Sequence, residues 1–214
     1  LHTVTIELGH MGVFKALVEA AELDHQAADK LLDALLRKAT DEVVECLNEN
    51  DVAPVTADLI LGLLQLNGGV GVVAEAKQYM AASPPMVLAA LDALDNLIGL
   101  LTERIPDINL HIDLAEMRGY RYHTGVIFAA YLPGEGREIA WGGRYDNIGQ
   151  QFGRQRAATG FSTDLKNLVS VRANTPIVRT MIYAPCSNEL GLVEAIRQLR
   201  ANGTVVIQAL PGQN

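Results

Sequence analysis

The sequence predicts an α+β protein built on an antiparallel sheet, because its hydrophobic period changes twice along 214 residues. From residue 12 to 104, apolar residues recur every three or four positions, as they do in amphipathic helices. From Ile108 to Phe161, short runs alternate apolar and polar residues, which is the period of half-buried strands. Residues 181–207 then read as strand, helix and strand. Helices and strands that are segregated along the chain are typical of the α+β class.

The helical zone follows a first predicted strand, Thr3–Leu8, and a predicted turn at Gly9-His10. Pro54, the Gly68-Gly69 pair and Pro84-Pro85 divide the zone into separate helices. They do so because proline removes a backbone donor and glycine frees the backbone. The zone is therefore expected to be a set of short amphipathic helices rather than one long helix.

The strand zone contains three predicted strands, at Ile108–Leu114, Val126–Tyr131 and Ile139–Trp141. Proline and glycine between the second and third strands, in Pro133–Gly136, mark a hairpin turn. A short helix is expected at 163–169. The last zone is one βαβ unit, whose two strands should be parallel by the usual right-handed crossover.

Two glycines follow the third predicted strand in the run Gly142–Asp146. A glycine pair lets a ligand approach the backbone closely, and Arg144 and Tyr145 offer donors beside it. A β-bulge or a tight strand exit explains the same run equally well. Gly160, which precedes Phe161, allows the same two interpretations.

His111 and His123 are candidate acid–base groups, because imidazole titrates near neutral pH. Isolated histidines on predicted strands are more often structural, and the residues alone favour that interpretation by about two to one. The acidic residues Asp107, Asp113 and Glu116 alternate too irregularly to suggest a metal site.

Composition excludes several classes of function. The apolar share of 49% is ample for a packed core, and the net charge of -8 argues against a surface that binds nucleic acid. Cys46 and Cys186 lie far apart without zinc or disulfide spacing, so no metal is expected and a reducing cytoplasm is the simplest compartment. Polar residues interrupt every long apolar run, so neither a membrane-spanning segment nor a signal peptide is expected.

Three ordered motifs carry a resemblance to a known family. They read Arg-Gly-Tyr-Arg-Tyr-His-Thr-Gly from Arg118, Gly-Gly-Arg-Tyr-Asp from Gly142 and Gly-Phe-Ser-Thr-Asp-Leu from Gly160. In this order and spacing they resemble the catalytic domain of class II histidyl-tRNA synthetases, whereas one motif alone would be a weak signal. The resemblance implies a class II aminoacyl-tRNA synthetase-like antiparallel sheet with helices.

The same resemblance divides the chain. Residues 1–170 correspond to the later part of such a domain, with 24–104 as a helical insertion. Residues 176–214 would be a partial C-terminal α/β domain. Because the chain opens inside a predicted strand, the N-terminal part of the family domain is expected to precede Leu1.

The third motif departs from that of a working synthetase. Asn167 stands where the synthetase carries an arginine for the ATP phosphates, and Lys166 stands where it carries an acid. Asp164 replaces the glycine that admits ATP, so its carboxylate would repel the polyphosphate. Activation of histidine by ATP is therefore not expected.

The wording of the first and third motifs is more similar to the regulatory subunits of ATP phosphoribosyltransferase than to true synthetases. This resemblance implies a self-associating subunit with no catalytic residues and no cofactor. It would activate a short-form catalytic subunit in the first step of histidine biosynthesis and sense histidine for feedback inhibition. Arg118 would face the histidine carboxylate, and Tyr122 and His123 would line the imidazole pocket. The implied histidine-binding residues are Arg118, Tyr122, His123, Gly142, Gly143, Tyr145 and Gly160.

Two other interpretations stay open. The chain could be a catalytic-domain fragment of a histidyl-tRNA synthetase, which Asp164, Asn167 and the acidic balance disfavour. It could also be an architectural, dimer-forming relative that binds neither ligand. Aminoacylation would identify the first, and an absence of histidine binding would identify the second.

Overall fold

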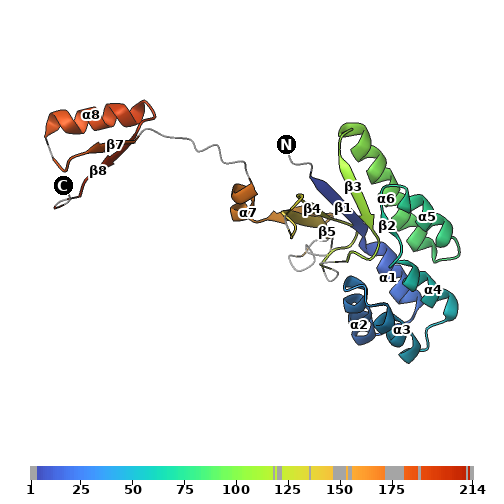
Figure 1. Cartoon of the computed structure of the whole chain (residues 1–214). Coiled ribbons are helices and arrows are strands. Elements are labelled where there is room, and N and C mark those ends of the chain that lie inside the picture. The colour runs from blue at the N-terminus through green and yellow to red at the C-terminus, as the bar shows by residue number, and fades with distance from the viewer. Residues whose placement is uncertain are drawn as a thin grey trace. The chain divides into compact units, whose positions relative to one another are not determined.

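The computed structural model describes residues 4–117, 119, 122–134, 136–146, 153, 156–171, 181–187, 189–210 and 212. The chain divides into two compact units, Leu1–Val169 and Ser170–Asn214. The first unit contains a mixed sheet with helices, and the second contains a small βαβ unit (Figure 1).

Six strands of the described residues form one sheet in the order β2-β3-β1-β4-β5-β6. Their bounds are β1 Thr5–His10, β2 Asn67–Gly68, β3 Asn109–Asp113, β4 Val126–Tyr131, β5 Ala140–Arg144 and β6 Thr159–Thr163. The predicted antiparallel pairing is correct for every neighbouring pair except β1 and β3, which run parallel. The helices between β1 and β3 form the crossover connection that a parallel pair needs.

One predicted turn and one predicted strand exit lie within strands instead. β1 continues through Gly9 and His10, which pair with β4. β5 continues to Arg144, and its residues Gly142 and Gly143 pair with β4 on one side and β6 on the other. The ladder runs through both glycines without a gap, so the pair is neither a turn nor a bulge. Gly160, the other glycine with two interpretations, lies within β6.

The predicted division of the helical zone is confirmed, although β2 interrupts it at the first of the Gly68-Gly69 pair. The helices are α1 Met11–Ala20, α2 His25–Leu36, α3 Thr40–Glu49, α4 Pro54–Gly62, α5 Val72–Tyr79 and α6 Pro85–Arg104. Helices α4 and α6 begin at a proline, where the missing N–H would have had no partner in the helix. Asp24 caps α2 by accepting the backbone N–H of Ala27 at 2.8 Å.

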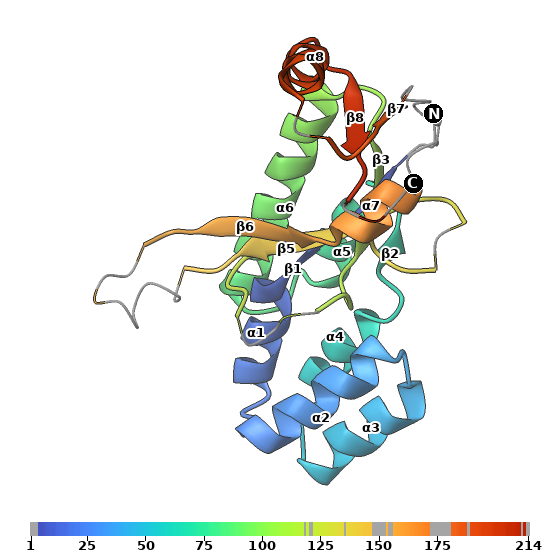
Figure 2. The same cartoon turned by 90° about the vertical axis from the view of Figure 1, so that its left-hand side faces the viewer.

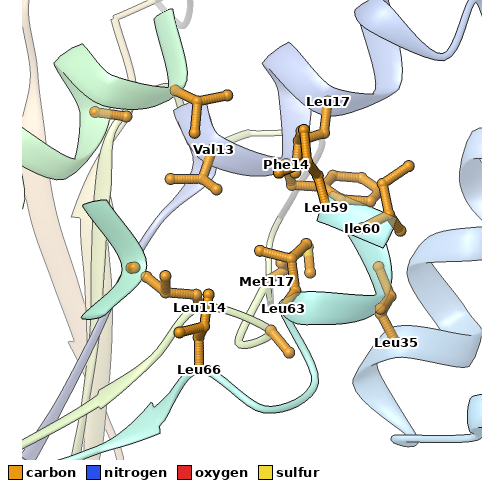
Figure 3. Close-up of a cluster of buried hydrophobic side chains, with 14 of the residues drawn as sticks. Val13, Phe14, Leu17, Leu35, Leu59, Ile60, Leu63, Leu66, Leu114 and Met117 are labelled. Carbon is orange, nitrogen blue, oxygen red and sulfur yellow. The ribbon is translucent and has the colours of Figure 1, made fainter. Parts of the chain in front are cut away.

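One hydrophobic core joins the helices to the sheet. Helix α1 lies at its centre, with Phe14 and Leu17 facing Leu59 and Ile60 of α4 (Figure 3). Leu35 of α2 lies beside the same group. Such fully buried side chains contribute about 1.5–3 kcal/mol each. Other members drawn in Figure 3 are Val13, Leu63, Leu66, Leu114 and Met117.

Helix α6 packs against α1 and β1 (Figure 2). An 18-residue window of this 20-residue helix has a mean hydropathy of 1.4, so by length and composition alone the helix could cross a membrane, whereas the sequence predicts no membrane-spanning segment. Val87, Leu91 and Leu94 on one side lie in the core. On another side Asp92 and Asp95 both pair with Lys77 of α5. One side of α6 therefore belongs to the core, and 28% of the apolar window is buried.

A buried carboxylate ties the helical zone to the sheet. Asp113, at the end of β3, is 7% exposed. One carboxylate oxygen accepts from Lys38 Nζ at 2.8 Å, and the other accepts from the backbone N–H of Ala115 at 2.8 Å. Lys38 follows α2 in the chain, so this ion pair fixes the far end of α2 to the sheet.

The second unit is the βαβ unit that the sequence predicts. Its elements are β7 Met181–Ala184, α8 Leu190–Ala201 and β8 Val205–Gln208, and the two strands are parallel. Ile196 of α8 packs with Ala184 and Val206 in a small core.

The short helix expected at 163–169 is α7 Leu165–Val171, which follows β6.

Candidate functional site

The candidate site lies on one face of β5 and β6. Gly143 pairs with Gly160, and Trp141 pairs with Ser162. Because paired residues of neighbouring strands point the same way and successive residues alternate, these four residues share one face of the sheet. Two of the four lack a side chain, which leaves the sheet surface open there.

Two aromatic rings occupy the space that these glycines leave. A Cβ atom on Gly143 would lie 2.8 Å from Cδ2 of His123, and a Cβ atom on Gly160 would run into the hydroxyl of Tyr145. The ring centroids of His123 and Tyr145 are 6.0 Å apart and the rings are tilted by 57°. The glycines therefore serve close packing of rings rather than a turn.

A tight turn places His123 on this face of the sheet. The backbone N–H groups of Tyr122 and His123 both donate to the carbonyl of Gly119, at 2.9 and 3.0 Å. Gly119 has φ +74, and a Cβ atom there would lie 2.5 Å from Nδ1 of His123. Nδ1 of His123 is buried without a hydrogen-bond partner among the described residues.

The end of β5 is held by a network of hydrogen bonds. Arg144 Nε donates to both carboxylate oxygens of Asp146, at 3.0 and 2.9 Å. Asp146 in turn donates its backbone N–H to Thr124 Oγ1 at 3.1 Å and accepts from Ala158 N at 3.2 Å. The backbone N–H of Thr124 donates to the carbonyl of Arg144 at 2.7 Å. This network joins the His123 turn to β5 and to the start of β6.

A pocket of about 280 Å³ lies between these groups. Ligand pockets commonly measure about 300–1,000 Å³, so this one suits a molecule the size of an amino acid better than a nucleotide. Tyr122, at 72% exposure, lies at the solvent side. The lining residues are Tyr122, His123, Trp141, Gly142, Tyr145, Gly160, Phe161 and Ser162.

The structure brings most of the predicted site residues together. Five of them line this pocket, and Gly143 contacts it through the ring of His123. Arg118 lies outside the described residues. The five predicted residues in the pocket are Tyr122, His123, Gly142, Tyr145 and Gly160.

Sequence reasoning missed Trp141, Phe161 and Ser162, which complete the pocket wall. Strand alternation could have found two of them. Trp141 precedes Gly143 by two positions, and Ser162 follows Gly160 by two, so each shares the face of its glycine.

The first turn of α7 carries the substituted third motif. Asp164 Oδ1 accepts the backbone N–H of Lys166 at 2.8 Å and that of Asn167 at 3.4 Å. Asn167 Oδ1 accepts from Arg137 Nη2 at 2.8 Å. The Asp164 carboxylate thus already occupies amides at the start of the helix, where an anionic ligand would otherwise bind.

A second, larger cavity of about 900 Å³ lies beside β4, β5 and α6. Val126 and Phe128 line it together with Ala93 and Leu97 of α6. His10 also lines it and caps α1, because its Nδ1 accepts the N–H of Gly12 at 3.0 Å. Burial and then the Arg144 guanidinium lower the pKa of His10 to about 4.

Solved structures share this fold. An ATP phosphoribosyltransferase regulatory subunit/histidyl-tRNA synthetase from Bacillus halodurans matches with a TM-score of 0.76 and 27% identity, over 99% of this chain and 55% of that chain. A histidyl-tRNA synthetase from Nostoc sp. PCC 7120 matches with a TM-score of 0.73 and 21% identity, over 100% of this chain and 54% of that chain. Both have the histidyl-tRNA synthetase-like class II fold, which is therefore the class of this protein.

The sequence gives a finer comparison. The family model for histidyl-tRNA synthetase matches residues 1–168, and that for the ATP phosphoribosyltransferase subunit HisZ C-terminal domain matches residues 179–214. The chain belongs to the histidyl-tRNA synthetase family.

Curated relatives confirm the resemblance to the regulatory subunits. The ATP phosphoribosyltransferase regulatory subunits of Pseudomonas entomophila and Chromohalobacter salexigens are 47% and 46% identical to this chain over 211 residues. Each match covers 98% of this chain and 53% of the relative. The chain thus spans about half the length of the curated relatives it matches.

Proposed function

We propose that this chain is part of a regulatory subunit of ATP phosphoribosyltransferase that binds histidine and has no catalytic activity of its own. The observation that carries the proposal is 47% identity over 98% of the chain to a relative with that name. The fold alone does not separate this function from that of a synthetase, because both kinds of protein share it.

The pocket supports histidine as the ligand. Its volume suits an amino acid, and the imidazole of a bound histidine could lie among the rings of His123 and Tyr145. A buried carboxylate needs a cation, and Arg118 is proposed to supply it through two parallel hydrogen bonds.

The third motif supports the absence of adenylation. A polyphosphate approaching α7 would meet the Asp164 carboxylate rather than free amides, and residue 167 is an asparagine hydrogen-bonded to Arg137 rather than an arginine. Electrostatic repulsion and the loss of a bidentate donor act in the same direction.

The proposed partner is the short-form catalytic subunit of ATP phosphoribosyltransferase. A fold neighbour at 21% identity and TM-score 0.57 comes from an ATP phosphoribosyl transferase (HisG:HisZ) complex of Thermotoga maritima. We expect the protein to self-associate and to act in the cytoplasm, where histidine is made.

The test is a reconstitution. The complete protein is mixed with a short-form catalytic subunit from the same source, and phosphoribosyl-ATP formation is followed with and without histidine. We expect activity to depend on this protein and to fall when histidine is added. Activity that is independent of this protein would refute the proposal. Activation that histidine does not affect would keep the subunit assignment and remove the sensing role.

A second candidate, a histidyl-tRNA synthetase fragment, is favoured by the family match over residues 1–168. It predicts histidine-dependent pyrophosphate exchange by the complete protein, whereas the regulatory subunit should stay at background. Measurable exchange would favour the synthetase.

A further inference from the structure

Lys15 of α1 contacts the turn that carries His123. Its Nζ atom donates to the carbonyl oxygen of His123 at 2.6 Å, across 108 residues of sequence. Neither the three motifs nor the hydrophobic pattern singles out this lysine. It is a half-buried side chain on a helix whose neighbouring residues form the core.

The partial burial of Lys15 makes its hydrogen bond to His123 important for the charge of the ammonium group. Desolvation lowers the pKa of Lys15. A partly buried ammonium group keeps its charge only when its N–H groups find acceptors, and the carbonyl of His123 is one of them. A hydrogen bond from a charged donor is stronger than a neutral one.

Helix α1 holds the turn at two points. The backbone N–H of Met11, the first residue of α1, donates to the carbonyl of Gly125 at 2.9 Å. Lys15 lies four positions later, on the same side of the helix, and reaches the carbonyl of His123. The two contacts bracket Thr124, so they fix the path of the backbone on which His123 is mounted.

We propose that Lys15 is a positioning residue for the histidine pocket: it holds the backbone at His123 so that the imidazole ring lies against Gly143 and beside Tyr145. This inference rests on the proposed function, because it takes the pocket to bind histidine. Lys15 is not itself among the residues that line the pocket, and it contacts the backbone carbonyl of His123, so we expect it to act through His123.

The test compares three variants of the complete protein. Lys15→Met removes the donor and keeps the aliphatic stem, Lys15→Arg keeps a charged donor, and Lys30→Met removes an exposed lysine on α2 as the matched control. By titration calorimetry we expect Lys15→Met to bind free histidine about three- to tenfold more weakly than wild type, as the net loss of one ordinary intramolecular hydrogen bond predicts. Lys15→Arg should recover part of the loss, and Lys30→Met should bind as wild type does.

Amide hydrogen exchange without histidine separates this inference from the proposed function. We expect the N–H groups of Tyr122, His123 and Thr124 to exchange faster in Lys15→Met than in Lys30→Met, at unchanged melting temperature. If wild type does not bind histidine, the proposed function fails, and the exchange rates still decide whether Lys15 holds the turn. Unchanged exchange at these amides, or equal histidine affinity in Lys15→Met and wild type, would overturn the role of Lys15.

Discussion

Gly143 and Gly160 need space more than backbone freedom, since neither adopts a positive φ. Gly142, which precedes Gly143 in β5, is equally confined, because a Cβ atom there would run into the carbonyl oxygen of Gly160. A side chain at any of the three would push backbone or a ring away from the sheet. This makes the glycines determinants of pocket shape at the scale of single residues.

Gly160→Ala tests that role. The added methyl group would displace the hydroxyl of Tyr145, so we expect histidine binding to weaken by about ten- to a hundredfold, the range that overpacking by one methyl group produces. The control is Gly99→Ala in α6, where nothing lies within 4 Å of the new Cβ atom. Calorimetry on the complete protein should show wild-type affinity for the control. Wild-type affinity in Gly160→Ala as well would mean that Tyr145 does not shape the pocket.

His10 gives a prediction for pH. Its pKa is lowered from 6.5 to about 4 by burial and by Arg144, and its Nδ1 must stay unprotonated to accept from Gly12. Below about pH 6.5, His10 therefore binds a proton in the unfolded chain but not in the folded protein. Stability should fall as pH drops from about 6.5 towards 4, and His10 should contribute no pH dependence above that window.

The matched variant is His10→Asn, which can still cap α1 but does not titrate. Urea unfolding between pH 4 and 8 should show a shallower loss of stability on the acid side in the variant than in wild type. Identical pH profiles would show that His10 titrates normally in the folded protein.

At the scale of elements, α7 carries the residues that we propose exclude ATP. Restoring the synthetase arginine with Asn167→Arg should leave histidine-dependent pyrophosphate exchange at background, because Asp164 still occupies the first amides of the helix. The companion variant, Asp164→Gly with Asn167→Arg, removes both obstacles. Exchange by the single variant would show that the Asp164 carboxylate does not exclude the nucleotide.

The junction between α2 and β3 predicts a stability difference between two lysines. Lys38→Met leaves the buried carboxylate of Asp113 without its cation and should cost about 1–3 kcal/mol of unfolding free energy. Lys77→Met breaks two pairs with carboxylates that are 64% and 57% exposed, and should cost at most about 1 kcal/mol. Urea unfolding of both variants measures the difference. Equal losses would show that burial of Asp113 does not matter.

At the scale of the whole molecule, the proposed function requires that histidine and the catalytic subunit affect each other's binding reciprocally. If bound histidine weakens the active assembly, then assembly must weaken histidine binding by the same factor. Calorimetric titration of histidine into the complete protein, alone and with the catalytic subunit, should give two affinities. Their ratio should equal the change that histidine causes in subunit affinity. Equal histidine affinities, together with histidine inhibition of the complex, would place the feedback site on another chain.

The sequence predicts the positions of strands better than it predicts which strands and side chains lie side by side. Val126–Tyr131 is found with the predicted bounds because a short, continuous run of apolar residues between turn residues identifies a strand locally. The parallel pairing of β1 with β3 has no local signal, since periodicity does not say which strand lies beside which. Gly142 and Gly143 were expected to follow a strand, whereas both lie within β5. A Cβ atom at either position would run into the backbone of a neighbouring strand, and at Gly143 also into the ring of His123. The role of Lys15 was not predicted either, because its partner His123 lies 108 residues away in the chain.

The position of β1 in the sheet has a consequence for how the chain folds. β1 lies between β3 and β4, and it is the strand that joins them. Its contact with β3 spans 104 residues between Thr5 and Asn109, whereas β4, β5 and β6 can pair through shorter connections. Contacts between distant residues form slowly, so we expect the helices and the β4-β5-β6 meander to form before β1 inserts. Until β1 inserts, α1 cannot bring Lys15 to the turn at His123, and the pocket is the last part of the unit to be completed.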